Sequence, residues 1–400
     1  MKRKFIAFGL LTISSLYIHA QSWKRAKNSD KLSKTDIQLV YSHYWQDGNH
    51  SAVTGGLGTE KLKVYSPDFT INFQRDSLSS FAINAGVDII SSASTDNIDF
   101  IMSSASKVDS HNYLNLSYSQ RKKNKPVVVG ASLYGSFESD YLSGGIGLNV
   151  QNTSEDQSRV LSAELEIFCD DLRWGRLNGE HKLQLVYPDE MRYKEWFDIH
   201  NRYSYNLNGT IQQTINRKTL FSIFPGISFQ HGLLSTPFHR VYFVDSAARV
   251  ENLPRNRFKL PLGIQLNRFL ANQFFVRAYY RFYCDNWGVL AHTAEMEFPV
   301  KLNAFVSITP SMRYYHQKGS RHFKSYYQHG IGERFYTSDY DLSTFNSYEP
   351  AVELKYNAAA AKPSALFNSF VLRYAYYKRS DGLASNTLSA LIGFSYYKKR

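Results

Sequence analysis

A period-two alternation of apolar and polar side chains is the feature that most constrains the fold of this chain. The clearest example runs from Arg202 to Phe229, with a polar turn at 216–218 in its middle. Before the turn, one parity carries Tyr203, Tyr205, Leu207 and Ile211, and the other carries Ser204, Asn206, Asn208, Thr210 and Gln212. Successive side chains of a strand point to opposite faces, so the stretch predicts two strands with one apolar and one polar face. The apolar face would meet a second sheet in a soluble sandwich, or lipid in an outer-membrane barrel.

The number and spacing of such segments favour the barrel. Sixteen segments alternate, an even number, as in single-chain bacterial barrels. The connections sort into a uniformly short set and an alternate set that contains every long insertion, at 170–198, 231–256 and 317–346. Membrane barrels show this asymmetry between short periplasmic turns and longer outer loops. We therefore expect an all-β, antiparallel, up-and-down transmembrane β-barrel of about 16 strands, with both termini periplasmic.

The amino-terminal residues indicate export. Three basic residues, 2–4, precede an apolar run, Phe5–Leu16, and Ala20 offers a cleavage site. This order predicts a secretory signal peptide over residues 1–20. Residues 21–34 then form a short periplasmic arm and 35–400 the barrel. No mature segment approaches about 20 uninterrupted apolar residues, which excludes a helical membrane protein. The expected location is the outer membrane of a Gram-negative bacterium.

The net charge limits the classes of partner, and the positions of the cysteines exclude a disulfide. A formal net charge of +13 suits an anionic lipid surface or solvated loops, and an exported chain without a basic cluster is not expected to bind nucleic acid. The expected partners are outer-membrane lipid and lipopolysaccharide, the outer-membrane insertion machinery, and a protein at the outer loops; no cofactor is expected. Cys169 and Cys284 fall at the outer ends of the seventh and eleventh strands, too far apart for a disulfide.

Two stretches carry a family resemblance. Residues 53–62 read VTGGLGTEKL and lead into 64–67, VYSP, while residues 87–96 read VDIISSASTD. They resemble a family of uncharacterised outer-membrane β-barrel proteins from Bacteroidetes-type bacteria, a domain-of-unknown-function family. The resemblance implies an outer-membrane location and a transmembrane barrel, and it implies no activity.

Charged residues on the polar parity are the candidates to line a lumen. Arg277 is expected roughly opposite Glu295 across the turn at 285–288. Opposed charges on neighbouring strands stabilise a wall modestly, and they also tune the ion preference of a pore. The complete predicted lumen set is Arg277, Arg281, Glu295, Glu297, Glu164, Glu166, Arg313, Glu353 and Arg373.

Residues 90–110 break the alternation and are expected to form a constriction loop. The motif SSAS occurs at 91–94 and again at 103–106, and its small side chains would let the loop pack into the lumen. Carboxylates on such a loop suit a hard cation such as calcium, but their spacing matches no calcium loop, so no metal site is predicted. The predicted constriction residues are Asp88, Ser91, Ser94, Asp96, Asp99, Ser103 and Ser106.

Three functions remain open, and the first is favoured. It is a porin-like or solute-transport barrel whose lumen is narrowed by the 90–110 loop. The alternative is an outer-membrane scaffold or surface-assembly partner with a plugged lumen and docking loops at 170–198, 231–256 and 317–346. A rim hydrolase built on Asp198, His200, Arg202 and Ser204 is least favoured. Residues two apart on a strand are about 6.6–6.8 Å apart, whereas nucleophile and base need about 2.6–3.2 Å, so no catalytic residue and no enzyme are predicted.

Overall fold

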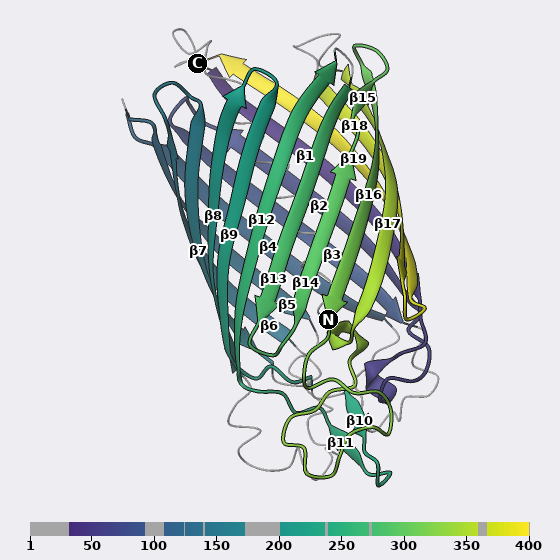
Figure 1. Ribbon diagram of the computed structural model, residues 1–400. Coiled ribbons are helices and arrows are strands. Elements are labelled where there is room, and N and C mark those ends of the chain that lie inside the picture. Colours follow the sequence, from purple (N-terminus) through teal and green to yellow (C-terminus); the bar gives the residue numbers. More distant parts are fainter. Residues whose placement is uncertain are drawn as a thin grey trace.

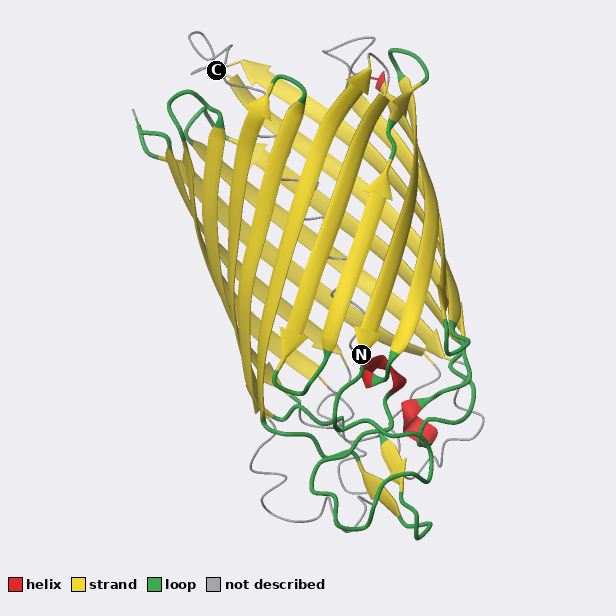
Figure 2. Ribbon diagram, viewed as in Figure 1, coloured by secondary structure: helices red, strands yellow, loops and turns green. Residues whose placement is uncertain are grey.

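The computed structural model is a closed antiparallel β-barrel with loops gathered at one end (Figures 1 and 2). It describes residues 32–92, 108–123, 125–138, 141–172, 201–236, 239–271, 274–358 and 366–399. The wall strands are β1 (Leu32–Asp47), β2 (Leu62–Gln74), β3 (Ser79–Ser92), β4 (Val108–Arg121), β5 (Val127–Glu138), β6 (Tyr141–Thr153), β7 (Arg159–Asp171), β8 (Asn201–Asn216), β9 (Thr219–Gly232), β12 (Asn256–Ala271), β13 (Phe274–Asp285), β14 (Leu290–Glu297), β15 (Val300–Lys301), β16 (Val306–Lys318), β17 (Phe345–Asn357), β18 (Phe367–Arg379) and β19 (Ala384–Lys399).

The wall closes on itself without an edge. Strand β1 pairs with β2 on one side and with β19 on the other, so that Ile37 lies opposite both Ile71 and Phe394. Strands β14 and β15 both lie between β13 and β16 and fill one place in the wall. The barrel therefore has 16 strand places, which confirms the predicted fold class.

The outward parity is apolar and uncovered. Leu133 on β5 is 59% exposed and Leu148 on β6 is 56% exposed, although both belong to well-paired strands. A sandwich would bury these side chains against a second sheet, whereas a membrane barrel presents them to lipid. Rings also contact one another on this face, such as Tyr205 with Phe229 and Tyr314 with Tyr348. The outer face of the barrel is therefore suited to contact with membrane lipid.

The connections differ at the two ends. One end, uppermost in Figure 1, carries the turns at 75–78, 122–126, 154–158 and 217–218 and is here called the short-turn end. The other, the long-loop end, carries two short strands and two 3-10 helices, β10 (Arg240–Tyr242), β11 (Ala248–Val250), η3 (Ala52–Thr54) and η7 (Tyr340–Leu342). No helix in the described ranges is long and apolar enough to cross a membrane.

Some predicted boundaries are wrong. Strand β3 continues to Ser92 and β4 begins at Val108, so the interruption between them is shorter than 90–110. Strand β1 begins at Leu32, inside the arm predicted for 21–34, because pairing with β19 continues as far as Lys399. Cys169 on β7 and Cys284 on β13 are free, as predicted.

Candidate functional site

The inner face of the wall is polar, and some of its side chains are open to water. Three inward-facing side chains from different parts of the ring, Asn208 on β8, Arg281 on β13 and Lys355 on β17, are exposed despite facing the axis. A packed interior would bury such groups or pair them, because an unpaired buried charge is costly. The lumen at these positions is therefore hydrated.

A ladder of opposite charges runs along the inner face of β13 to β18. Arg313 and Arg373 both approach Glu349, with N···O distances of 3.7 Å in each case. The strand register adds Glu295 opposite Arg313 and Glu353 opposite Arg373. All nine residues of the predicted lumen set lie on inward-facing parities, whereas their part in ion selection stays a prediction.

The predicted partner of Arg277 is wrong by two residues. Arg277 lies opposite Glu297 and forms an ion pair with it, while Tyr279 lies opposite Glu295. The cause is the turn that joins β13 to β14. Asp285 accepts the backbone N–H groups of Trp287 (3.0 Å) and Val289 (3.0 Å), and the turn occupies 286–289, one residue later than the tight turn predicted at 285–288. A turn displaced by one residue moves the partner across the strand pair by two.

Two carboxylates stand apart from this ladder on the opposite wall. Glu164 and Glu166 face the lumen from β7, opposite Asn208 and Asn206 of β8. Neither forms an ion pair with a cationic side chain in the described part of the chain. The wall of β5 to β8 is thus acidic at mid-height, and it faces a wall where positive and negative groups alternate.

A third polar cluster lies on β2 to β4. Asp68 accepts hydrogen bonds from the hydroxyl of Tyr113 (2.6 Å) and from Asn84 Nδ2 (2.7 Å). Asp88 contacts His111, with 3.1 Å between Oδ2 and Nδ1. Gly86 makes the first contact possible, because a Cβ there would collide with the Tyr113 ring. A glycine therefore lets this tyrosine lie flat against the wall.

The same arrangement recurs around the lumen. Phe168 lies over Gly145, and the hydroxyl of Tyr134 would be 3.0 Å from a Cβ added at Gly147. The Tyr279 hydroxyl likewise would be 2.9 Å from a Cβ at Gly263. Aromatic side chains that cover glycines in this way compensate for their missing side chains. Because these aromatic side chains lie along the wall and do not point toward the axis, they take up less of the lumen.

Two of the predicted constriction residues belong to the wall. Asp88 and Ser91 lie on strand β3, where they pair with His111 and Val108, and not in a loop. For Ser91 the reason is that the strand pairing continues past the end of the alternation at residue 89. Asp88 precedes the 90–110 interruption, and its placement in the loop is wrong because it still belongs to the alternating strand. The other five, Ser94, Asp96, Asp99, Ser103 and Ser106, lie outside the described residues.

The described loops of the long-loop end pack together into one body, here called the cap (residues 48–61, 233–236, 239–255, 286–289, 319–344 and 380–383). Tyr242 of β10 lies against Gly55, and His50 stacks on Tyr340 with ring centroids 3.9 Å apart. The loops that carry Gly55 and Tyr242 follow β1 and β9, which stand on opposite sides of the ring. Their contact therefore spans the long-loop end of the barrel (Figure 2).

An apolar cluster forms the core of the cap, and Tyr283 of β13 packs against it. Trp287, at the tip of the β13–β14 turn, is 1% exposed and packs with Leu234, Leu253, Val289 and Leu342. Its indole N–H donates to the backbone oxygen of Asn256 (3.1 Å). Burying one large aromatic side chain among three loops gives the cap a core of its own.

Two buried arginines add charged anchors. Arg257 donates through Nε to Asp285 (2.8 Å) and lies 4.3 Å from the ring centroid of Trp287. Arg379, 3% exposed, donates to Asp341 (2.6 Å) and to the Tyr340 oxygen (2.7 Å), and it pairs with Asp381. The Arg257 pair joins two wall strands and supports Trp287 of the cap, whereas Arg379 joins a wall strand to a loop. Breaking such a buried pair is costly.

Carboxylates order the tip of the cap. Glu251, 2% exposed, accepts the backbone N–H of Thr236 (2.6 Å) and the hydroxyl of Thr337. Glu333 pairs with Lys324 and contacts His329 Nδ1 (2.7 Å). Burial raises the pKa of Glu333, but hydrogen bonds from Lys324, the Gly330 N–H and His329 outweigh it and bring the pKa to about 2.

The residues considered for a rim hydrolase are engaged in the wall or lie outside the described residues. Arg202 donates to Asp170 (2.6 Å), which also accepts from Ser143 (2.7 Å). Ser204 accepts from Gln230 Nε2 (3.2 Å). The remaining two, Asp198 and His200, belong to the undescribed segment. The described members make wall contacts and form no nucleophile–base pair.

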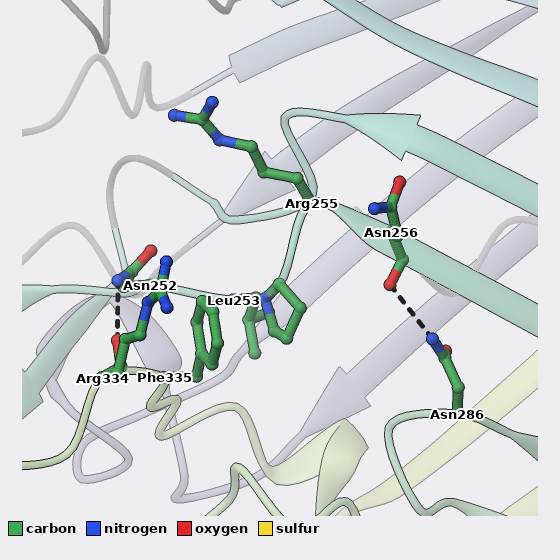
Figure 3. A pocket seen from close by; sticks show the side chains of 8 residues that line it. Asn252, Leu253, Arg255, Asn256, Asn286, Arg334 and Phe335 are labelled. Carbon is green, nitrogen blue, oxygen red and sulfur yellow. Dashed lines mark hydrogen bonds between the residues drawn. The ribbon is translucent and has the colours of Figure 1, made fainter.

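A pocket of about 580 Å³ opens at the root of the cap (Figure 3). The sequence did not single out this pocket or the anchors of the cap. The one sequence signal for the anchors was Trp287 in the turn 285–288, since a large aromatic side chain at the tip of a turn usually needs a packing partner. The pocket is lined by Asn252, Leu253, Pro254, Arg255, Asn256, Asn286, Arg334 and Phe335.

An edgeless barrel with an apolar outside and a charged, hydrated inside defines the class of outer-membrane β-barrels. The chain belongs to the family described as protein of unknown function (DUF3570), which matches residues 8–390. This confirms the predicted uncharacterised family, while a Bacteroidetes-type origin and the signal peptide stay predictions.

The solved structures that are similar to the chain have low sequence identity to it. OccK1 (OpdK) of Pseudomonas aeruginosa is 8% identical, with a TM-score of 0.41 over 92% of this chain and 99% of that one. A BenF-like porin of Pseudomonas fluorescens Pf-5 is 6% identical, with a TM-score of 0.42 over 91% and 99%. A bacterial polysaccharide outer membrane secretin is 8% identical, with a TM-score of 0.48 over 92% and 99%. No curated protein sequence matches the chain.

Proposed function

We propose that this protein is a porin-like channel for small hydrophilic solutes in the outer membrane, with the cap restricting entry at its outer mouth. The single observation that supports this best is the exposure of inward-facing Asn208, Arg281 and Lys355 around the ring. A barrel of this strand number is wide enough to leave an aqueous path, unlike an eight-stranded one. The long-loop end then faces the exterior and the short-turn end the periplasm.

The wall also supports a preference among solutes. The carboxylates of Glu164 and Glu166 face a ladder in which most charges are already paired. Their field attracts cations and disfavours anions at mid-height. We therefore expect a channel that conducts small cations and neutral solutes better than anions of the same size.

Conductance of the purified protein in a planar lipid bilayer tests the proposal. Discrete conductance steps that scale with salt concentration are expected, with a reversal potential in a salt gradient that shows cation preference. A protein that inserts fully folded but gives no conductance would contradict the channel. The folded state is checked separately by its resistance to unfolding in detergent before heating.

A second function has its own observation. Val244 and Ile331 are both 58% exposed, and they lie on two cap loops that are joined by a hydrogen bond from the Val244 N–H to the His329 oxygen (3.0 Å). Exposed apolar groups at a loop tip suit a protein partner. A surface-assembly role would be favoured by stable co-purification of one partner that is lost in a Val244→Asp, Ile331→Asp variant, together with absent conductance. Phospholipid, lipopolysaccharide and the insertion machinery are the other proposed partners.

A further inference from the structure

The pocket at the root of the cap lies on the outside of the barrel rim. Asn256 Oδ1 contacts His231 Nδ1 (2.7 Å), and His231 stands on the outward parity of β9 together with Phe229. Asn286 Oδ1 accepts the backbone N–H of Phe258 (3.0 Å), the first apolar outward position of β12. The pocket is therefore next to the apolar outer belt and apart from the lumen.

The height of the pocket matches the level of the lipid headgroups. Outward positions of β12 are apolar from Phe258 to Leu266 and polar at Asn256 and Arg268 on either side. At about 3.3 Å per residue and a tilt of about 35–45°, the two polar positions differ in height by about 28–32 Å. The apolar belt of a membrane barrel is about 25 Å tall. Asn256 and the pocket beside it therefore lie just outside the hydrocarbon.

The pocket carries positive charge without matching carboxylates. Arg255 and Arg334 are exposed, and neither makes an ion pair with any described residue. Arg321 adds a third guanidinium by donating to the Asn286 backbone oxygen (3.0 Å). Three carboxylates directly precede lining residues in the sequence, and all three are engaged elsewhere. Asp285 binds Arg257, Glu333 binds Lys324, and Glu251 accepts from Thr236 and Thr337. Planar guanidinium groups bind phosphate oxygens in pairs of hydrogen bonds.

The remaining lining suits a sugar. Asn252 donates its Nδ2 to the Arg334 oxygen (2.8 Å), and Asn256 Oδ1 contacts His231, so Asn252 Oδ1 and Asn256 Nδ2 are the amide groups that face a ligand. Phe335 and Pro254 offer an apolar wall (Figure 3). A backbone bridge between Asn252 and Tyr336, with N···O distances of 3.1 and 2.7 Å, fixes the two sides of the pocket relative to each other. The volume of about 580 Å³ falls within the range of about 300–1,000 Å³ typical of ligand pockets.

We propose that this pocket binds the phosphorylated sugar headgroup of a glycolipid in the outer leaflet. The inference rests on the outer-membrane location of the proposed function, and it names where the protein contacts that lipid. The ligand chemistry is a phosphate ester on a hydroxylated sugar, and both a lipid headgroup and a soluble sugar phosphate present it. The position beside the apolar belt favours the lipid, because the acyl chains of a headgroup bound there lie against Phe258 and its outward neighbours.

Binding to the full-length protein in detergent tests the site, with deep-rough lipopolysaccharide as the probe and native mass spectrometry as the readout. The variant Arg255→Gln, Arg334→Gln is expected to bind about ten-fold or more weakly, since each charged hydrogen bond is worth more than a neutral one. The matched control is Arg217→Gln, the same change on the exposed β8–β9 turn at the short-turn end. Lipopolysaccharide without its phosphates is expected to bind weakly to both proteins. The variant and the parent should then have the same affinity.

Other outcomes overturn the proposal. Equal binding by the parent and the double Gln variant, or equal loss in Arg217→Gln, means that the pocket does not hold the phosphate. Glucosamine 6-phosphate binding as tightly as lipopolysaccharide means that the pocket takes a soluble anion. Should the Gln variant not fold, Arg255→Lys, Arg334→Lys keeps the charge and is expected to bind several-fold more weakly through loss of the paired geometry. Lipopolysaccharide binding in detergent does not require an open lumen. A negative binding result therefore does not contradict the channel, and absent conductance does not contradict the pocket.

Discussion

Replacing Arg379 by methionine should release the cap while leaving the barrel intact. The guanidinium joins the end of β18 to Asp341 (2.6 Å) and the Tyr340 oxygen (2.7 Å), and it lies 3.9 Å from the ring centroid of Phe345. Loss of one partner of a buried pair costs about 3–5 kcal/mol. Asp341 retains 26% side-chain exposure, so the lower figure applies. A cost of about 3 kcal/mol raises the undocked fraction of the loop about 100-fold.

Trypsin cleavage of the folded protein measures this release. The loop 319–344 carries basic residues at 321, 324 and 334, and cleavage there should accelerate strongly in Arg379→Met. The control is Arg249→Met, because the Arg249 guanidinium lies over the face of Phe243, a contact worth about 0.5–1 kcal/mol, and forms no ion pair within the described part of the chain. Similar cleavage rates in the two variants would refute the assignment of Arg379 as an anchor. So would loss of the folded barrel, which would mean that the arginine stabilises the wall and not the cap.

Three further predictions follow from the wall and the cap. Gly86→Val should push Tyr113 off the wall and lower the single-channel conductance, and adding Tyr113→Ala should restore it. Glu164→Gln with Glu166→Gln should reduce cation preference, seen as a reversal potential closer to zero, without changing the folded yield. The folded-state pKa of Glu333, about 2, lies below its ordinary value of 4.5. Its contribution to cap stability is therefore complete above pH 4.5 and is lost as the pH falls through about 2. Pepsin cleavage of the cap should rise across that window, and the Glu333→Gln variant should show a flatter profile.

The strand order and the facing of each side chain were predictable from the sequence. Lipid on one side and water on the other impose opposite polarity on neighbours such as Leu207 and Asn208, and a shift of one residue would exchange them. The same rule placed Glu164, Arg313 and Arg373 on the inner face. This alternation rule works for a wall of one layer because each side chain faces either lipid or the lumen.

The cap and the pairing of charges were not predictable in this way. Contacts such as Arg379 with Asp341 or Trp287 with Leu234 join loops far apart in sequence, and loops carry no period that reports them. The partner of Arg277 depends on the residue at which the turn begins, and the Asp285 side chain holds that turn by accepting two backbone N–H groups. The amino-acid composition of the turn does not predict which residue pairs with Arg277. The pocket of Arg255 and Arg334 likewise forms only when two loops meet.

Labelling of two neighbouring positions tests the central claim most directly. In a background with Cys169 and Cys284 replaced by serine, Asn208→Cys and Leu207→Cys are placed one residue apart on β8. A charged, membrane-impermeant thiol reagent should modify Asn208→Cys in lipid vesicles and reduce the conductance of that variant, because its side chain lies in a water-filled lumen. Leu207→Cys should stay unmodified in lipid. Modification of Leu207→Cys with protection of Asn208→Cys, or protection of both, would contradict a hydrated channel inside this barrel.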